Sequence, residues 1–156
     1  MGAIEDRISQ LGHALPGQSS PGGNYVPAVS VPGLGLVYTA GHVARRPDGT
    51  LIVGKLGADM SIEVGHEAAR ITALNLLGTL KEEIGELDRV TRIVKLLCMV
   101  NSTPDFGQHP AVANGASDLL VEIFGDAGKH ARSAVGLASL PGGVCIEIEM
   151  IVQVSP

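Results

Sequence analysis

Hydrophobic and polar residues alternate most regularly near the end of the chain. Between positions 144 and 154 almost every second residue is apolar, and the positions between them hold polar side chains that include Glu147, Glu149 and Gln153. A period of two is typical of a β-strand with one buried face and one polar face. A second extended segment, residues 131–138, precedes it across the turn residues 140–143. This short connection predicts an antiparallel hairpin, in which Arg132 and a glutamate could share a face.

The pattern upstream predicts further helices and strands. Apolar residues at three-to-four spacing indicate helices over residues 3–11, 61–84 and 110–124, and Ser61 is a suitable N-cap for the second helix. Shorter extended segments cover residues 25–31, 34–41 and 51–53, and a longer apolar strand covers residues 90–100. We therefore expect an α+β fold, with a mixed β-sheet and two helices on one of its faces.

The segment 90–100 raises a question of burial. After Arg92 it is interrupted only by Lys95, and a strand of this kind is usually buried on both faces. Two helices can cover only one face of a sheet, and soluble monomers seldom expose large apolar surfaces. We therefore expect a homo-oligomer in which the open faces of several sheets pack together.

Length, net charge and the distribution of apolar residues limit the classes of function that we consider for this protein. The length of 156 residues suits one domain over residues 1–156, with residues 1–23 as an N-terminal helix and loop extension. The net charge of −5, with scattered basic residues, argues against a nucleic-acid partner. No apolar run approaches the roughly 18 residues that a membrane span needs, so we expect no membrane partner and a cytoplasmic location. Cys98 and Cys145 lie in apolar runs and are expected to be reduced, structural thiols.

Four segments together resemble one known family. Residues 131–152 read ARSAVGLASLPGGVCIEIEMIV, and NYVPA at 24–28, VYTAGHV at 37–43 and VANGASDLLVEIFG at 112–125 occur in the matching order. These four segments resemble the sequences of a divergent subgroup of the RidA/YjgF family of reactive-intermediate deaminases. This family includes proteins called endoribonuclease L-PSP-like. The resemblance implies a chorismate-mutase-like fold and a homotrimer whose sheets enclose a central β-barrel. It also implies pockets between subunits.

The resemblance further implies hydrolysis of 2-imino acids, or their enamine tautomers, to 2-oxo acids and ammonia, without a metal or an organic cofactor. Arg132 matches the family arginine that binds the substrate carboxylate, a role that suits a planar guanidinium. Glu147 matches the glutamate that holds or activates the attacking water. The backbone at Ala40 and Gly41 would face the reacting carbon, and Tyr25 and Asn114 match residues that line the same cleft.

Two departures from the family leave alternatives open. Ala40 stands where relatives often have serine, and Ala134 stands where many have cysteine. His42, which follows Gly41, could transfer protons or could be a surface histidine at a strand end. The remaining histidines show no metal-ligand spacing, and we expect no metal site. A cofactor-free imine deaminase is therefore one hypothesis, and a non-catalytic trimeric binder of small carboxylate metabolites is its rival. Endoribonuclease action fits the acidic charge poorly.

Overall fold

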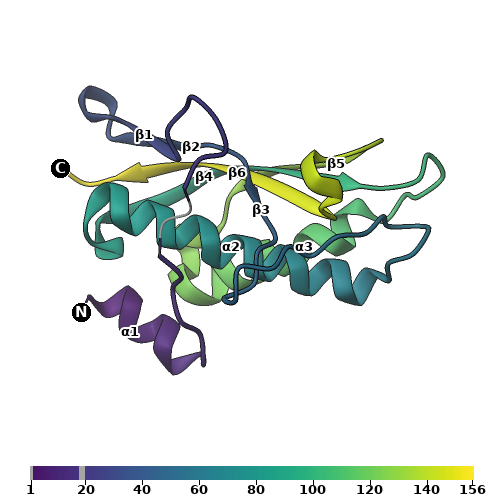
Figure 1. The fold of residues 1–156 in the computed structure, drawn as a ribbon. Coiled ribbons are helices and arrows are strands. Elements are labelled where there is room, and N and C mark those ends of the chain that lie inside the picture. Colours follow the sequence, from purple (N-terminus) through teal and green to yellow (C-terminus); the bar gives the residue numbers. More distant parts are fainter. Residues whose placement is uncertain (1, 18–19) are drawn as a thin grey trace.

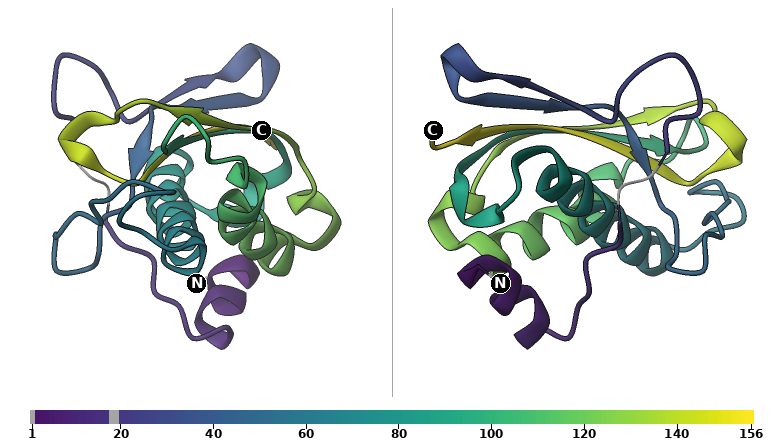
Figure 2. Two further views of the ribbon diagram at one scale, coloured as in Figure 1. Left: turned by 90° about the vertical axis from the view of Figure 1, so that its right-hand side faces the viewer. Right: turned by 60° about the vertical axis from the view of Figure 1, so that its left-hand side comes forward.

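The protein is built in layers, with one sheet covered by helices on a single face. The computed structural model describes residues 2–17 and 20–156. Helices α2 (Ile62–Ile84) and α3 (His109–Phe124) lie side by side beneath the sheet, and the short helix α1 (Ala3–Gln10) packs outside α3 (Figures 1 and 2). This arrangement confirms the expected α+β fold with two helices on one sheet face.

The sheet contains six strands, and its order differs from their order in the sequence. The path runs β1-β2-β6-β4-β5, and the two-residue strand β3 also pairs with β6. Strands β4 and β5 are parallel, whereas the other pairs are antiparallel, so the sheet is mixed as expected. The strands are β1 (Ala28–Val31), β2 (Leu36–Thr39), β3 (His42–Val43), β4 (Val90–Asn101), β5 (Ala131–Leu137) and β6 (Ile146–Val154).

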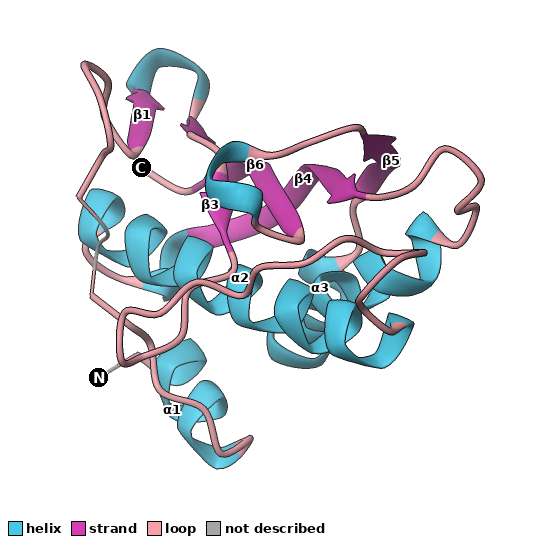
Figure 3. Ribbon diagram, turned by 45° about the vertical axis from the view of Figure 1, so that its right-hand side comes forward, coloured by secondary structure: helices cyan, strands magenta, loops and turns pink. Residues whose placement is uncertain are grey.

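The predicted antiparallel hairpin of β5 and β6 is wrong, because β4 lies between them. Leu96 of β4 faces Arg132 of β5 on one side and Met150 of β6 on the other. The β4–α3–β5 segment is a strand–helix–strand crossover, and such a connection joins parallel neighbours (Figure 3). The turn after β5, with a 3-10 helix at Pro141–Gly143, therefore passes over the end of β4 to reach β6.

Strand β4 is buried on one face within a single chain. Ile93, Leu96 and Cys98 are fully buried under the helices, whereas Val94 is 38% exposed and Leu97 is only half-buried. The sequence predicted that both faces of β4 are buried, and within one chain only one face is. Helices cover one face, and the apolar residues of the other face are the surface on which the expected association depends.

Local signals in α2 explain where it begins and how the N-terminal segment crosses it. The Ser61 side chain accepts a hydrogen bond from the Val64 amide at 3.3 Å, as predicted for an N-cap. Gly78 faces the segment after α1, and a Cβ at this position would collide with the carbonyl oxygen of Pro16. The missing side chain therefore lets the segment around Pro16 cross over α2. No helix within residues 2–17 and 20–156 is both long enough and apolar enough to span a membrane.

Candidate functional site

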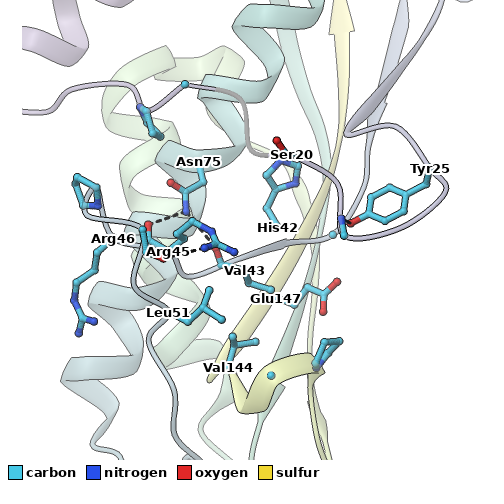
Figure 4. A pocket seen from close by; sticks show the side chains of 18 residues that line it. Ser20, Tyr25, His42, Val43, Arg45, Arg46, Leu51, Asn75, Val144 and Glu147 are labelled. Atoms are coloured by element: carbon cyan, nitrogen blue, oxygen red, sulfur yellow. Dashed lines mark hydrogen bonds between the residues drawn. The ribbon is translucent and has the colours of Figure 1, made fainter.

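Most of the expected site residues line one cavity at the end of β3. This cavity has a volume of about 560 Å³ and is bounded by Tyr25, Gly41, His42 and Glu147 (Figure 4). Ser20 and Gly22 of the N-terminal segment contribute to its wall. Residues from three separate parts of the sequence are therefore brought together, as expected for a ligand-binding site.

Glu147 faces the backbone of Gly41 across the β3–β6 pairing. Val43 of β3 is the register partner of Glu147, and a Cβ at Gly41 would overlap the Glu147 carboxylate. Glycine therefore permits the close approach between this carboxylate and the backbone. Partial burial raises the pKa of Glu147, and the nearby charge of Glu149 raises it further. A carboxyl group with a raised pKa is better suited to exchange protons near neutral pH.

His42 lies beneath this cavity and is only 6% exposed. Its Nδ1 lies 2.9 Å from the carbonyl oxygen of Ala40, and its Nε2 lies 2.8 Å from the hydroxyl of Thr79. A carbonyl can only accept, so Nδ1 carries the proton, and in the neutral ring Nε2 accepts from Thr79. Burial lowers the pKa of His42, although the bond to Ala40 opposes this shift, and the neutral form is favoured. Both ring nitrogens are thus bonded within the chain.

Ala40 and Tyr25 are positioned by backbone hydrogen bonds. The Ala40 amide donates to the carbonyl of Pro27 at 2.8 Å, and the Ala40 carbonyl accepts from His42. The Tyr25 hydroxyl accepts from the Gly22 amide at 3.2 Å, while the residue as a whole is 52% exposed. Tyr25 therefore presents an exposed ring at the rim of the cavity.

Arg132 and Asn114 meet in a second place, between β5 and α3. The Arg132 Nη1 donates to the Asn114 side-chain oxygen at 2.9 Å and to the Ser117 hydroxyl at 3.0 Å. Ser117 lies in turn 2.9 Å from Nε2 of His130, whose Nδ1 contacts the Gly128 carbonyl. Burial lowers the pKa of His130, and the Arg132 charge lowers it further. A neutral His130 leaves the guanidinium as the charged group of this cluster.

Within one chain Arg132 and Glu147 lie on opposite faces of the sheet. Arg132 is the register partner of Leu96, which is fully buried under the helices. Glu147 is the partner of Met99, which belongs to the alternate, less buried positions of β4. Paired residues of neighbouring strands point to the same face, so Arg132 faces α3 and Glu147 faces away from the helices. The expectation that Arg132 and a glutamate share a face fails together with the hairpin.

Sequence reasoning missed three residues that support the site. Ser117 lies three positions after Asn114, a spacing that places both on one helix face and could have suggested a shared partner. Asn75 donates to the carbonyl oxygens of Val43 and Arg45 at 3.1 Å and fixes the chain after β3. Thr79, the partner of His42, carries no signal of its own in the sequence. In residues 2–17 and 20–156, no three histidine, cysteine or acidic side chains are grouped so that they could hold a metal ion.

The chain is similar to known proteins over most of its length. Residues 5–148 match the family model described as "YjgF/chorismate mutase-like, putative endoribonuclease". Protein TCP17 of Trypanosoma cruzi is 39% identical over 155 residues, which cover 99% of this chain and 96% of the relative.

Two solved structures are similar over nearly the whole chain. The Agrobacterium tumefaciens protein Atu1372, described as being of unknown function, is 36% identical with a TM-score of 0.88, covering 97% of this chain and 94% of that one. A "putative endoribonuclease" from Shewanella oneidensis MR-1 is 32% identical with a TM-score of 0.92, covering 98% and 100% of the two chains. The chorismate-mutase-like fold expected from the four sequence segments is confirmed.

Proposed function

Because this chain belongs to the RidA/YjgF family, we propose that it hydrolyses reactive 2-imino acids, or their enamine tautomers, to 2-oxo acids and ammonia. The reaction adds water across the C=N bond of the substrate. The resulting carbinolamine then loses ammonia to leave the carbonyl group. No redox step is involved, so the residues must bind a carboxylate and move protons.

The observation that carries this proposal is that hydrogen bonds within the chain already hold the Arg132 side chain in one orientation. Asn114 and Ser117 both accept from Nη1, which holds the guanidinium in one orientation. Among the hydrogen bonds of the described residues, none occupies Nε or Nη2 of Arg132. These two groups form one edge of the planar fork and can bind a carboxylate through two parallel hydrogen bonds. The side chain is half-buried, which strengthens such a bond relative to one in open water.

The opposite placement of Arg132 and Glu147 supports a site between subunits. A small imino acid is too short to reach through the sheet from one group to the other. A second copy can bring its Glu147, Gly41 and Tyr25 to the Arg132 and Asn114 of its neighbour. A head-to-tail interface of this type closes into a ring, and we propose that the ring is a homotrimer. The apolar positions of β4 that one chain leaves uncovered, such as Leu97, would then line the centre of that ring.

In the assembled site Glu147 would act on water. Its carboxylate accepts a proton from water as the oxygen attacks the imine carbon and passes this proton to the nitrogen, which gives the neutral carbinolamine. It then carries the remaining hydroxyl proton to the nitrogen, so that the C–N bond breaks, the C=O bond forms and ammonia leaves. Burial and Glu149 raise the pKa of Glu147, so its carboxylate is a stronger base toward water than that of an ordinary glutamate. Glycine at position 41 lets this carboxylate lie against the backbone segment that would face the reacting carbon.

His42 has a supporting role in this scheme. It donates from Nδ1 to the Ala40 carbonyl and accepts at Nε2 from Thr79, so it has no free nitrogen for a substrate. We assign it to positioning the backbone at Ala40 and Gly41 against Glu147. Its effect on catalysis then passes through the geometry of that backbone segment.

A non-catalytic binder remains the second candidate, and one observation favours it. Ala40 and Ala134 place methyl groups where relatives often carry a hydroxyl and a thiol. The carboxylate fork does not depend on those side chains, so binding of a 2-oxo acid would persist without turnover. Endoribonuclease activity is disfavoured, because the net charge is −5 and RNA binding relies on clustered basic residues.

One assay separates the two candidates. An L-amino-acid oxidase generates 2-iminobutyrate or 2-iminopropionate in place, and ammonia and 2-oxo acid are followed with and without the protein. The deaminase predicts faster release that requires both Arg132 and Glu147. A pure binder shows thermal stabilisation by 2-oxobutyrate and leaves the release rate at its uncatalysed value, which would overturn the proposed activity.

Mixing two inactive variants tests the site between subunits. Arg132→Ala and Glu147→Gln chains, unfolded together and refolded at equal amounts, form mixed rings. In a head-to-tail trimer about one site in four then combines an intact Arg132 with an intact Glu147 from its neighbour. Activity should recover to about a quarter of the wild-type value. If both groups acted within one chain, the mixture would stay inactive.

A further inference from the structure

A second cavity lies at the other end of β5 from Arg132. Its volume is about 460 Å³, within the range of small-molecule sites. It opens where β4 ends and α3 begins, on the helix side of the sheet. The lining includes Lys55, Ser102, Phe106, His109 and Gly136.

The absence of a side chain at Gly136 keeps this cavity open. Gly136 lies inside strand β5 and is not among the glycines with positive φ, so its backbone does not require glycine. Glycine weakens a strand, and its presence there often marks a close approach of another group. A Cβ at Gly136 would collide with Nε2 of His109 and would lie 2.5 Å from the hydroxyl oxygen of Ser102. These two groups contact each other at 3.1 Å, and only glycine leaves room for both.

Lys55 brings a fixed positive charge to the cavity. Its ammonium donates to the Asn101 side-chain oxygen at 2.7 Å and to the carbonyl oxygen of Ala138 at 2.5 Å. Asn101 is only 5% exposed and donates to the Gly54 and Val144 carbonyls, so the partner of Lys55 is itself rigid. An ammonium group has three N–H bonds, which leaves one donor for a ligand. Unlike a free surface lysine, this side chain loses little rotamer freedom when it binds an anion.

The charges of the lining residues specify the ligand. None of the lining side chains is acidic, and Asp105 in the adjacent loop is exposed and outside the lining. None of the ion pairs found in the part of the chain that the structure describes involves Lys55. The hydroxyl of Ser102 and the ring of His109 add hydrogen-bonding groups, whereas Phe106 and the residues around it provide an apolar wall. The lining therefore suits an oxyanion attached to an apolar body.

We propose that this cavity is a second binding site, which takes an organic carboxylate or phosphate monoester through Lys55, Ser102 and His109. It is separate from the Arg132 site. Positions 132 and 136 are four residues apart along β5, which corresponds to about 13 Å of strand. Ser117, which bonds to Arg132, and His109, beside Gly136, lie eight residues apart on α3, or about 12 Å of helix. The two sites thus lie at opposite ends of the contact between α3 and β5.

Ligand-observed NMR titration of the full-length protein tests this proposal, with phenyl phosphate, benzoate and inorganic phosphate as probes. Lys55→Met removes the charge and keeps the aliphatic stem, and Gly136→Val fills the cavity. Lys129→Met is the matched control, because Lys129 is an exposed lysine paired with Asp126 outside the cavity. Melting curves report whether each variant is folded.

We expect phenyl phosphate or benzoate to bind the wild type more tightly than inorganic phosphate, because only the former contact the apolar wall. Lys55→Met should weaken binding at least about tenfold, and Gly136→Val should abolish it. Lys129→Met and Arg132→Ala should leave it within about twofold. If Gly136→Val does not fold, Lys55→Met decides the matter.

Two results would overturn the second site. One is wild-type affinity in Lys55→Met, and the other is absence of binding of all three probes at millimolar concentration. If Arg132→Ala abolished binding while Lys55→Met did not, the probe would occupy the Arg132 site. The second site would then fall, and the proposed imine chemistry at Arg132 would stand.

Discussion

Replacing Arg132 by alanine should reduce the affinity for 2-oxo acids far more than it reduces stability. Truncating one partner of a hydrogen-bonded charge pair typically costs about 2–5 kcal/mol of binding free energy. Each 1.4 kcal/mol corresponds to about tenfold in Kd, so Arg132→Ala should weaken binding of pyruvate or 2-oxobutyrate by roughly 30-fold or more. Arg132→Lys should recover only part of this loss, because an ammonium cannot form the two parallel bonds of the fork.

The same substitution removes two hydrogen bonds within the chain, to Asn114 and Ser117. The side chain is only half-buried, and after its removal water can reach the two partners. A net loss of about 1 kcal/mol corresponds to about 2–4 °C in Tm for a domain of this size. A ligand-binding arginine thus predicts a large loss of affinity with a small change in Tm.

Calorimetric titration and melting curves measure both quantities on the same samples. Arg92→Ala is the matched control, because Arg92 is an exposed arginine on β4 whose hydrogen bonds within residues 2–17 and 20–156 go to the carbonyl oxygens of Asp126 and Lys129. This variant loses the same charge and should bind 2-oxo acids like the wild type. A lower Tm with unchanged affinity in Arg132→Ala would show that Arg132 has a structural role, and the reasoning on its free edge would be refuted.

Three further predictions concern the rest of the site. Glu147→Gln should lower imine turnover by about 100-fold or more while 2-oxo acid binding persists. The folded state raises the pKa of Glu147, so the ionised carboxylate destabilises the fold. Glu147→Gln should therefore have a higher Tm than the wild type at pH 7, and this difference should disappear below the ordinary pKa of 4.5. Burial lowers the pKa of His42, so the unfolded chain binds more protons below 6.5, and acidification through this range should destabilise the wild type. His42→Gln should reduce that acid dependence in melting curves, and it should lower turnover while ligand binding stays nearly unchanged. Equal turnover by the variant and the wild type from pH 5 to 8 would contradict the positioning role of His42. Leu97→Asp should prevent assembly or folding, and a soluble trimer of this variant in light scattering would contradict the proposed packing of the open faces.

The helices could be predicted from the sequence because their signals are local. The spacing of apolar residues in α2 recurs within one or two turns, and Ser61 marks its start by bonding to an amide three residues away. Such interactions lie within a short stretch of chain and leave a pattern that can be read directly. The predicted helix bounds accordingly agree with the structure to within two residues at each end.

The strand pairing could not be predicted in the same way. The β5–β6 hairpin seemed to follow from the short connection between the two segments, but pairing is decided by contacts between distant residues. Cys98 pairs with both Ala134 and Ile148, and no local pattern announces that a strand from earlier in the chain will enter between the other two. The strand–helix–strand order around α3 was the available clue, because a crossover of this kind favours parallel neighbours.

The sequence suggested residue types for the candidate site but not the contacts that support them. Resemblance to the family suggested Arg132 and Asn114, and the structure brings their side chains to 2.9 Å. The partners Thr79 and Ser117 escaped notice because hydroxyl residues in helices are common and their roles depend on what packs against them. His42 was interpreted either as a group that transfers protons or as a surface histidine at a strand end. The second interpretation is wrong, because the side chain is buried against α2, and this burial suggests that it positions the backbone.

The separation of Arg132 from Glu147 has a chemical advantage for the proposed reaction. A guanidinium beside a carboxylate lowers the pKa of that carboxylate and forms an ion pair with it. If the two groups met within one chain, Glu147 would be a weaker base and the fork of Arg132 would be occupied. Holding them on opposite faces keeps the pKa of Glu147 raised and leaves one edge of Arg132 free. In the proposed assembly the substrate carboxylate neutralises the guanidinium, so Glu147 keeps the basicity that attack by water requires.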